Sequence, residues 1–306
     1  MEPTSSNGSG EPSTFLHDRN IPPAAFGFLV LVGVFLLYQV GGGLMTYLAM
    51  GDLTVTAQNV QTVRLVTLLS QLLFILAPSL IVARLVSHDV RSVFPIRMPS
   101  MREFLVQVLS LLALQRVLET AVFLQNSIPL PDIIESIVGP VKEMLQSMMS
   151  LILSSDTVPE FVFVAMVVAV VPAFAEELYF RGLVQSLFGR AWTPFWGAMV
   201  SGVLFGLFHL NPFDVVGLIG LGLFFGYVRY RSASMVPPIF LHFLNNMLAV
   251  VAVRLGMKND EMLVQSAGQS ADMETMLLQG VLFGLLFAWM MWLFHRMTRT
   301  VAGVGS

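Results

Sequence analysis

Eight apolar segments divide this sequence, and they constrain its fold more than any other feature. They lie near residues 26–50, 65–86, 104–124, 161–187, 195–212, 214–229, 236–253 and 276–295, of which the third is the most polar and the sixth is short. A helix of about 20 apolar residues crosses the hydrocarbon core of a bilayer, and a helix pairs its own backbone polar groups there. The sequence therefore predicts an all-α polytopic membrane bundle of about eight transmembrane helices.

The composition supports a membrane protein and excludes several kinds of site. Hydrophobic residues make up 56% of the 306 residues and charged residues only 11%, whereas soluble domains carry about 25% charged residues. The net charge is −3 and no basic tract is present, so we expect no nucleic-acid partner. The chain has no cysteine, which excludes disulfides, thiolate metal sites and cysteine nucleophiles.

The distribution of Lys and Arg predicts the orientation of the bundle. With eight spans and both termini in the cytoplasm, the cytoplasmic segments hold Arg19, Arg84, Arg91, Arg97, Arg102, Arg181, Arg190, Arg229, Arg231, Arg296 and Arg299. The external segments hold Arg64, Lys142, Arg254 and Lys258, together with most of the acidic loop residues. This asymmetry predicts a multi-pass protein of a bacterial cytoplasmic membrane with both termini inside.

The sequence also predicts a division into regions. Residues 1–25 are polar and rich in Ser, Gly and Pro, which is typical of a disordered tail. Residues 26–298 form the integral membrane domain, with accessory helices at 26–130, catalytic core helices at 160–255 and a last helix at 276–295. Apolar residues recur at helical spacing through 132–154. We interpret this segment as an amphipathic helix on the outer membrane surface, with a short re-entrant piece as the alternative.

Two adjacent carboxylates and an arginine interrupt the fourth apolar segment. Glu177 and Arg181 are four residues apart and share a helix face, while Glu176 lies about 100° round the helix from Glu177. Ionisable groups at membrane depth are costly and usually functional. One carboxylate can therefore be held by the arginine while the other points into a cavity, although a structural ion pair between helices is the alternative.

Two later spans carry polar residues as well. Phe205 and His209 share a face of the fifth span, and His242 and Asn246 share a face of the seventh. A single buried histidine is more often structural than catalytic. Here three neighbouring spans each contribute polar side chains to apolar surroundings, so the hypothesis of a site depends on their convergence.

Other polar and small residues in the spans favour packing roles. Arg116 and Glu119 are three residues apart in the third span and can pair with each other. Gly202 and Gly206 in the fifth span, and Gly222 and Gly226 in the sixth, have the spacing that lets helix backbones approach closely.

The converging set suits the activation of water. Glu176 can act as a general base, and a neutral His209 can orient the same water. His242 and Asn246 can donate hydrogen bonds to the oxyanion of a tetrahedral intermediate. Glu176, His209 and His242 could instead bind a divalent metal such as zinc, since two histidines and a carboxylate with an open position form a catalytic zinc site. The sequence does not separate these mechanisms.

Motifs of other intramembrane proteases are missing. The chain has no His-Glu-x-x-His zinc motif and no Gly-x-Ser-Gly nucleophile segment, and Gly51-Asp52 lacks the preceding glycine of an aspartyl site. Three motifs are present instead: Glu176-Glu177-x-x-x-Arg181, Phe205-x-x-x-His209 and His242-x-x-x-Asn246. In order, spacing and placement on successive spans they resemble the signature of the CPBP family, the CAAX-protease and bacteriocin-processing (Abi) intramembrane endopeptidases.

This resemblance covers roughly residues 160–255 and implies a function. It implies an endopeptidase that hydrolyses a membrane-associated peptide or protein without a required cofactor, with Glu176 and His209 activating water. His242 and Asn246 would form the oxyanion site, and Glu177 and Arg181 would support it. A metal remains the alternative, since the family was earlier described as metalloproteases. One alternative function is a catalytically silent immunity or scaffold protein that binds a peptide partner. Another is a small transporter that relays protons.

The predicted span boundaries disagree with a compact site. At 1.5 Å per residue they place Glu176 about 16 Å and His242 about 9 Å from the inner ends of their spans, but His209 about 20 Å from its own. The three side chains can meet only if the fifth span is tilted, broken or starts deeper.

Overall fold

The computed structural model describes residues 15–256 and 272–298 of the chain, and within these residues it is all-helical. Residues 1–14 of the expected tail, and Lys258 and Arg299 of the charge count, lie outside the described residues. The later part of the expected tail is helical, because α1 (Phe15–Asp18) buries Leu16 in the core and α2 already begins at Pro23.

All eight predicted spans are helices. Their bounds are α2–η1–α3 (Pro23–Leu36, Leu37–Gly41, Gly42–Met50), α4–η2–α5 (Val60–Ser70, Gln71–Leu76, Ala77–Val86), α7 (Met101–Asn126), α9–η3–α10–η4–α11 (Val158–Ala165, Met166–Val170, Val171–Glu177, Leu178–Val184, Gln185–Ala191), α12 (Pro194–Phe208), α13 (Val215–Ser232), α14 (Val236–Arg254) and α16 (Met273–Met297). Within the described ranges, six of them are long and apolar enough to cross a membrane. The other two are α12, which is short, and α13, whose last turn holds Arg229 and Arg231. The polytopic bundle is confirmed.

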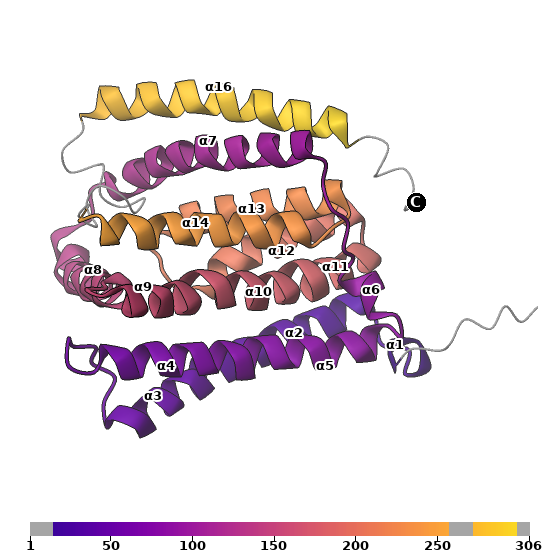
Figure 1. Ribbon diagram of the computed structural model, residues 1–306, viewed down its shortest axis with the longest axis horizontal. Coiled ribbons are helices and arrows are strands. Elements are labelled where there is room, and N and C mark those ends of the chain that lie inside the picture. The colour runs from indigo at the N-terminus through magenta and orange to yellow at the C-terminus, as the bar shows by residue number, and fades with distance from the viewer. Residues whose placement is uncertain (1–14, 257–271, 299–306) are drawn as a thin grey trace, which may run out of the picture.

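The spans run roughly parallel in layers (Figure 1). The long helix α9–α11 lies between α2–α5 on one side and α12–α14 on the other, and α7 and α16 form an outer pair. Its side chains Tyr179, Phe180, Leu183 and Leu187 are fully buried in the main apolar cluster. The fourth span is therefore the central helix of the bundle, which is where Glu176 and Glu177 lie.

Local sequence signals set the starts of several spans. Ser100, Thr157, Thr193 and Asp272 precede α7, α9, α12 and α16, and each side chain accepts a hydrogen bond from a backbone N–H in the first turn. These N-caps satisfy donors that have no partner inside the helix. The start of α12 at Pro194 matters for the site, because it fixes how far along the helix His209 lies.

Three of the spans contain π-helical turns, labelled η1 to η4 above, of which η3 and η4 lie in the same span. Such turns widen a helix locally and are frequent at functional sites. Tyr38 lies in η1, Gln71 in η2 and Val168 in η3, and all three line the cavity described below. Arg181 lies in η4. The irregular turns therefore surround the same space as the predicted site.

The glycine pairs do bring two helices together. A Cβ at Gly202 of α12 would lie 2.7 Å from the backbone of Gly222 of α13, and one at Gly226 would lie 2.7 Å from the carbonyl oxygen of Ala198. No side chain fits in this contact. The close approach holds α12 against α13 and so fixes the helix that ends directly before His209.

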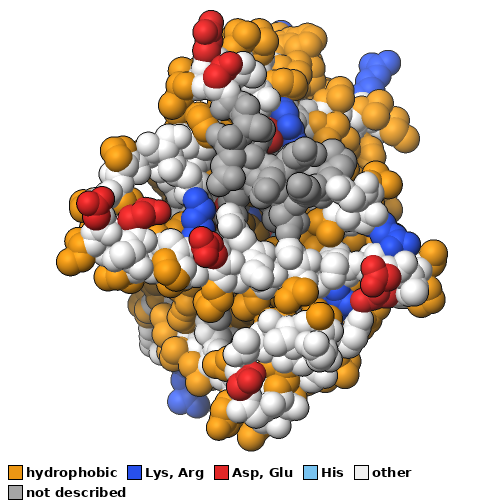
Figure 2. Space-filling view, turned by 90° about the vertical axis from the view of Figure 1, so that its left-hand side faces the viewer, with side chains coloured by type: hydrophobic (Ala, Val, Ile, Leu, Met, Phe, Trp, Pro, Cys, Tyr) orange, Lys and Arg blue, Asp and Glu red, His pale blue; other side chains and the backbone are white. Residues whose placement is uncertain are grey.

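The predicted surface helix is α8 (Asp132–Leu153), and it crosses one end of the bundle. It is viewed almost along its axis in Figure 1, while the spans lie across the view. Ile133, Ile134, Ile137 and Met144 are exposed along it, and acidic side chains are scattered over this end of the molecule (Figure 2). This orientation favours the interfacial helix over a re-entrant piece, and its contact with a membrane surface stays a prediction.

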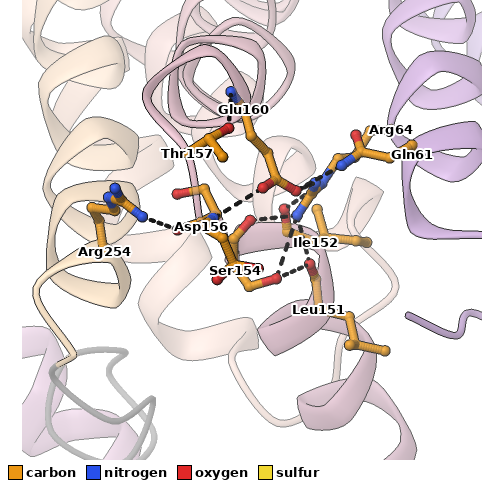
Figure 3. A network of polar contacts seen from close by, with 10 residues as sticks. Gln61, Arg64, Leu151, Ile152, Ser154, Asp156, Thr157, Glu160 and Arg254 are labelled. Atoms are coloured by element: carbon orange, nitrogen blue, oxygen red, sulfur yellow. Dashed lines mark hydrogen bonds and ion pairs between the residues drawn. The ribbon is translucent and has the colours of Figure 1, made fainter. Parts of the chain in front are cut away.

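Arg64 of α4 secures the end of α8 that is nearest the site. Its buried guanidinium donates to the carbonyl oxygens of Leu151 and Ile152, at 2.8 and 3.0 Å, and pairs with Glu160 of α9 at 2.6 Å (Figure 3). It thereby satisfies carbonyls that a helix end leaves unpaired. Arg64 and Arg181 are therefore not loop residues, as the charge count assumed, since both side chains are fully buried within helices. Without Arg181 on the cytoplasmic side and Arg64 on the external side, the predicted cytoplasmic segments still hold more Lys and Arg than the external ones.

Candidate active site

The carboxylate of Glu177 is the fixed point of the site. The Nη1 atom of Arg181 lies 2.9 Å from Oε1 of Glu177, and both side chains are completely buried. The Nη2 atom of Arg181 donates to the carbonyl oxygen of Gly222 on α13, and its guanidinium lies 4.4 Å from the centre of the Phe205 ring. The spacing of Glu177 and Arg181 predicted this pair. Its contacts also join the central helix to α12 and α13.

His242 of α14 is held by the same carboxylate. Its Nδ1 atom lies 2.8 Å from Oε1 of Glu177, and its ring stacks on Phe225. A carboxylate only accepts hydrogen bonds, so Nδ1 carries the proton. Nε2 then points the other way, 4.0 Å from Oε2 of Glu176. Glu177 therefore fixes the position of His242 and the proton on its Nδ1 atom.

His209 is oriented in a similar way by the backbone. Its Nδ1 atom lies 2.8 Å from the carbonyl oxygen of Phe205, one turn earlier in α12. A carbonyl oxygen also only accepts, so Nδ1–H donates here, and Nε2 lies 3.8 Å from Oε2 of Glu176. Both imidazoles consequently present Nε2 to the same carboxylate oxygen.

Glu176 is the member of the pair without a fixed partner. Its Oε2 atom is buried and accepts no hydrogen bond from the described residues. The gaps of 3.8 and 4.0 Å to the two Nε2 atoms are too long for direct hydrogen bonds. Each gap does allow a water oxygen to lie about 2.8 Å from both of the atoms that it separates. Glu176 thus lies where water could bridge it to either histidine.

A chain of amides orients Asn246. Gln115 of α7 donates to Asn245, Asn245 donates to Oδ1 of Asn246, and Nδ2 of Asn246 donates to the carbonyl oxygen of Val168, at 3.2, 3.1 and 2.9 Å. Because Oδ1 is held by a donor, the amide cannot flip without losing that bond. Its second N–H is left for the cavity, as an oxyanion donor requires.

These groups line one cavity of about 270 Å³, in which the structure brings Glu176, His209, His242 and Asn246 together. Its remaining polar lining comes from side chains that the sequence did not single out: Tyr38, Thr67, Gln71 and Asn245. Met149 and Ile152 of α8 close part of it. A mixed apolar and polar wall around a few converging groups is typical of a binding site.

The length of the central helix resolves the mismatch in depth between Glu176 and His209, while His242 lies six residues, about 9 Å, after the start of α14 at Val236. The central helix ends at Ala191 and not near 187, and α12 begins at Pro194. Glu176 lies 15 residues before Ala191, and His209 lies 15 residues after Pro194. Both are therefore about 22 Å from the shared turn at residues 192–193. Because the central helix and α12 are antiparallel neighbours and these two distances are equal, Glu176 and His209 lie at the same depth.

The metal alternative stays a prediction. The described residues contain no group of three His, Cys, Asp or Glu side chains arranged to hold a metal ion. The donor atoms are of the right kind, because Nδ1 of His242 donates to Glu177 and leaves Nε2 turned toward Glu176, as in a carboxylate–histidine–metal contact. Glu176, His209 and His242 are the residues that would hold an ion.

Comparison with known proteins supports the interpretation of the motifs. Residues 158–248 match the family described as type II CAAX prenyl endopeptidase Rce1-like. No curated protein and no solved structure matches the chain. The matched segment contains every residue of the three motifs, so the resemblance to the CAAX-protease family is confirmed for the part of the chain that forms the site.

Proposed function

We propose that this protein is an intramembrane endopeptidase that hydrolyses a peptide bond of a membrane-associated peptide or protein. The observation that carries the proposal is the shared position of the two Nε2 atoms and Oε2 of Glu176 at the wall of one cavity. These atoms belong to three helices of a chain whose catalytic segment matches a CAAX protease family. Glu176 acts as the general base, and His209 orients the attacking water.

The hydrogen-bonding capacity of one water assigns the remaining roles. Ionised Glu176 and two neutral imidazoles present three acceptors, whereas a water has only two protons to donate. His242 is the imidazole beside a carboxylate, so we assign the additional proton to its Nε2. His242 can then donate to the substrate. With Glu176, Glu177 and Arg181 it forms a cluster of four groups with no net charge.

The reaction follows from these roles. Glu176 takes a proton as the water oxygen attacks the carbonyl carbon of the peptide bond. The oxyanion accepts hydrogen bonds from Nε2–H of His242 and from the second N–H of Asn246. Glu176 then returns the proton to the leaving nitrogen as the C–N bond breaks. In this mechanism Glu177 and Arg181 position His242 and do not touch the substrate.

The most direct test compares membranes that differ only in this protein. Membrane fractions would be analysed by proteomics with the wild-type protein, with Glu176→Ala, and with no protein. We expect new peptide ends in the wild-type sample alone. If Glu176→Ala gave the same ends, another group would be the base. If no ends appeared and the phenotype of the wild type survived in Glu176→Ala, the protein would be the silent peptide-binding alternative.

Chelators test the proposal that no metal is required. We expect cleavage by the purified protein to continue at an unchanged rate after treatment with 1,10-phenanthroline and removal of free metal by dialysis. The reason is that the described side chains supply a base, an orienting histidine and two oxyanion donors without an ion. Activity that was lost on chelation and restored by zinc would instead make Glu176, His209 and His242 metal ligands.

A further inference from the structure

Two arginines inside the bundle show how this chain accommodates a structural guanidinium. Arg64 donates to carbonyl oxygens at the end of α8 and pairs with Glu160. Arg181 pairs with Glu177, donates to Gly222 and lies against Phe205. Both side chains are 0% exposed. In this protein, an arginine with a packing role is therefore fully buried and surrounded by several hydrogen-bond acceptors.

Arg116 of α7 does not follow this pattern. Its side chain is 41% exposed, and Nη1 lies 2.8 Å from Oε2 of Glu119. A guanidinium has five N–H donors, and the others have no acceptor among the described residues. Arg116 lies ten residues before the end of α7 at Asn126, which is about 15 Å along the helix. A cation at that depth with free donors indicates a ligand.

Glu119 lies beside Arg116 in the lining of the cavity described below, but its side chain is only 3% exposed. Its Oε2 atom forms the ion pair with Arg116 and accepts a hydrogen bond from Gln279 of α16 at 2.9 Å. The carboxylate is therefore engaged mainly in the contact between α7 and α16. The guanidinium is the exposed part of the pair, so the surface it presents is a hydrogen-bond donor with positive charge.

That surface lines a second cavity, which adjoins the candidate active site. The second cavity has a volume of about 440 Å³ and is formed by α7, α13, α14 and α16. Leu221 and Asn245 line both cavities, and Asn245 donates to the active-site Asn246. A volume of this size is typical of a ligand pocket. An extended chain in the second cavity could continue past Asn245 to Glu176.

We propose that the second cavity is a substrate subsite in which Arg116 binds a carboxylate of the peptide. This inference rests on the proposed function, because it names a property of the substrate of that same site. The carboxylate is either the free C-terminus or an acidic side chain close to the scissile bond. A guanidinium can donate two parallel hydrogen bonds to one carboxylate. The free donors of Arg116 allow this bidentate geometry.

Binding of defined peptides tests the subsite without the need for cleavage. Three fluorescent Leu/Ala dodecapeptides would be titrated into the purified Glu176→Gln protein: one with a free C-terminus, one amidated, and one amidated with a single internal Glu. We expect at least one carboxylate peptide to bind about 10- to 100-fold more tightly than the amidated neutral one, the range for a hydrogen bond to a charged group. The peptide that gains affinity identifies the source of the carboxylate.

Substitutions then assign the effect to Arg116. Arg116→Gln should remove the preference, and Arg116→Gln with Glu119→Gln should remove it without an unpaired carboxylate. Arg102→Gln, an exposed site in the first turn of α7, should retain it. Equal binding of all three peptides, or a preference that survives Arg116→Gln in a protein with unchanged thermal stability, would overturn the inference. So would an anionic lipid that copurifies only when Arg116 is present, if the peptides bind alike.

The two proposals can fail separately. If wild-type protein cleaves membrane peptides but Arg116→Gln leaves the relative affinities unchanged, hydrolysis stands and the subsite is wrong. If the carboxylate preference depends on Arg116 but wild-type protein cleaves nothing, the subsite stands and the protein binds peptides without hydrolysing them.

Discussion

Glu176→Gln is expected to lower kcat for peptide cleavage by at least about 100-fold and up to about 10,000-fold, the range for loss of a general base. The variant should still fold. Oε2 of Glu176 is buried without a hydrogen bond from the described residues, so an amide of the same shape removes no fixed contact. We expect the free energy of unfolding to change by less than about 1 kcal/mol. Peptide kinetics and thermal unfolding of the same purified sample measure both effects.

The matched control is Glu143→Gln on the exposed surface of α8. It makes the same chemical change away from the cavity and should leave both kcat and thermal stability as they are in the wild type. A Glu176→Gln protein that melts like the wild type and still cleaves at more than a third of its rate would remove Glu176 from the role of base. Loss of activity together with a collapse in stability would instead indicate that Glu176 holds the bundle together.

Apolar periodicity predicted the spans well, because lipid demands long, self-paired helices. It was less exact at the ends of the spans. Polar residues begin again at Arg190, which is exposed, so the predicted fourth span stopped at residue 187, four residues short of Ala191. That error alone produced most of the apparent difference in depth between Glu176 and His209.

The candidate site was predictable only where its residues recur at helical spacing. The spacing in the sequence shows that Glu177 with Arg181, and His242 with Asn246, form pairs on one helix face. Tyr38, Gln71 and Gln115 do not, since each lies in a helix far away in sequence and has no partner of the site at helical spacing. Asn245 had one signal, its position beside Asn246. Which of these side chains meet depends on π-helical turns and helix rotation, for which the sequence has no visible pattern.

Arg181→Met is expected to destabilise the protein by about 3–5 kcal/mol, the cost of removing one partner from a buried ion pair. Glu177 would keep its contact with His242 but lose the guanidinium that pairs with it, at 0% exposure. The contacts of the guanidinium with Gly222 and Phe205 would also be lost. Thermal or denaturant unfolding in detergent measures the loss, and cleavage assays below the melting temperature measure activity in the protein that remains folded.

A double-mutant cycle separates the ion pair from the packing of the arginine. Glu177→Gln alone should also destabilise, because it removes the carboxylate that accepts from both Arg181 and Nδ1 of His242. In Glu177→Gln with Arg181→Met no uncompensated charge remains between the two positions. The combined loss should therefore be smaller than the sum of the single losses by about 1–3 kcal/mol. Strict additivity would mean that the two groups act independently and that Arg181 does not hold the carboxylate of Glu177 in place.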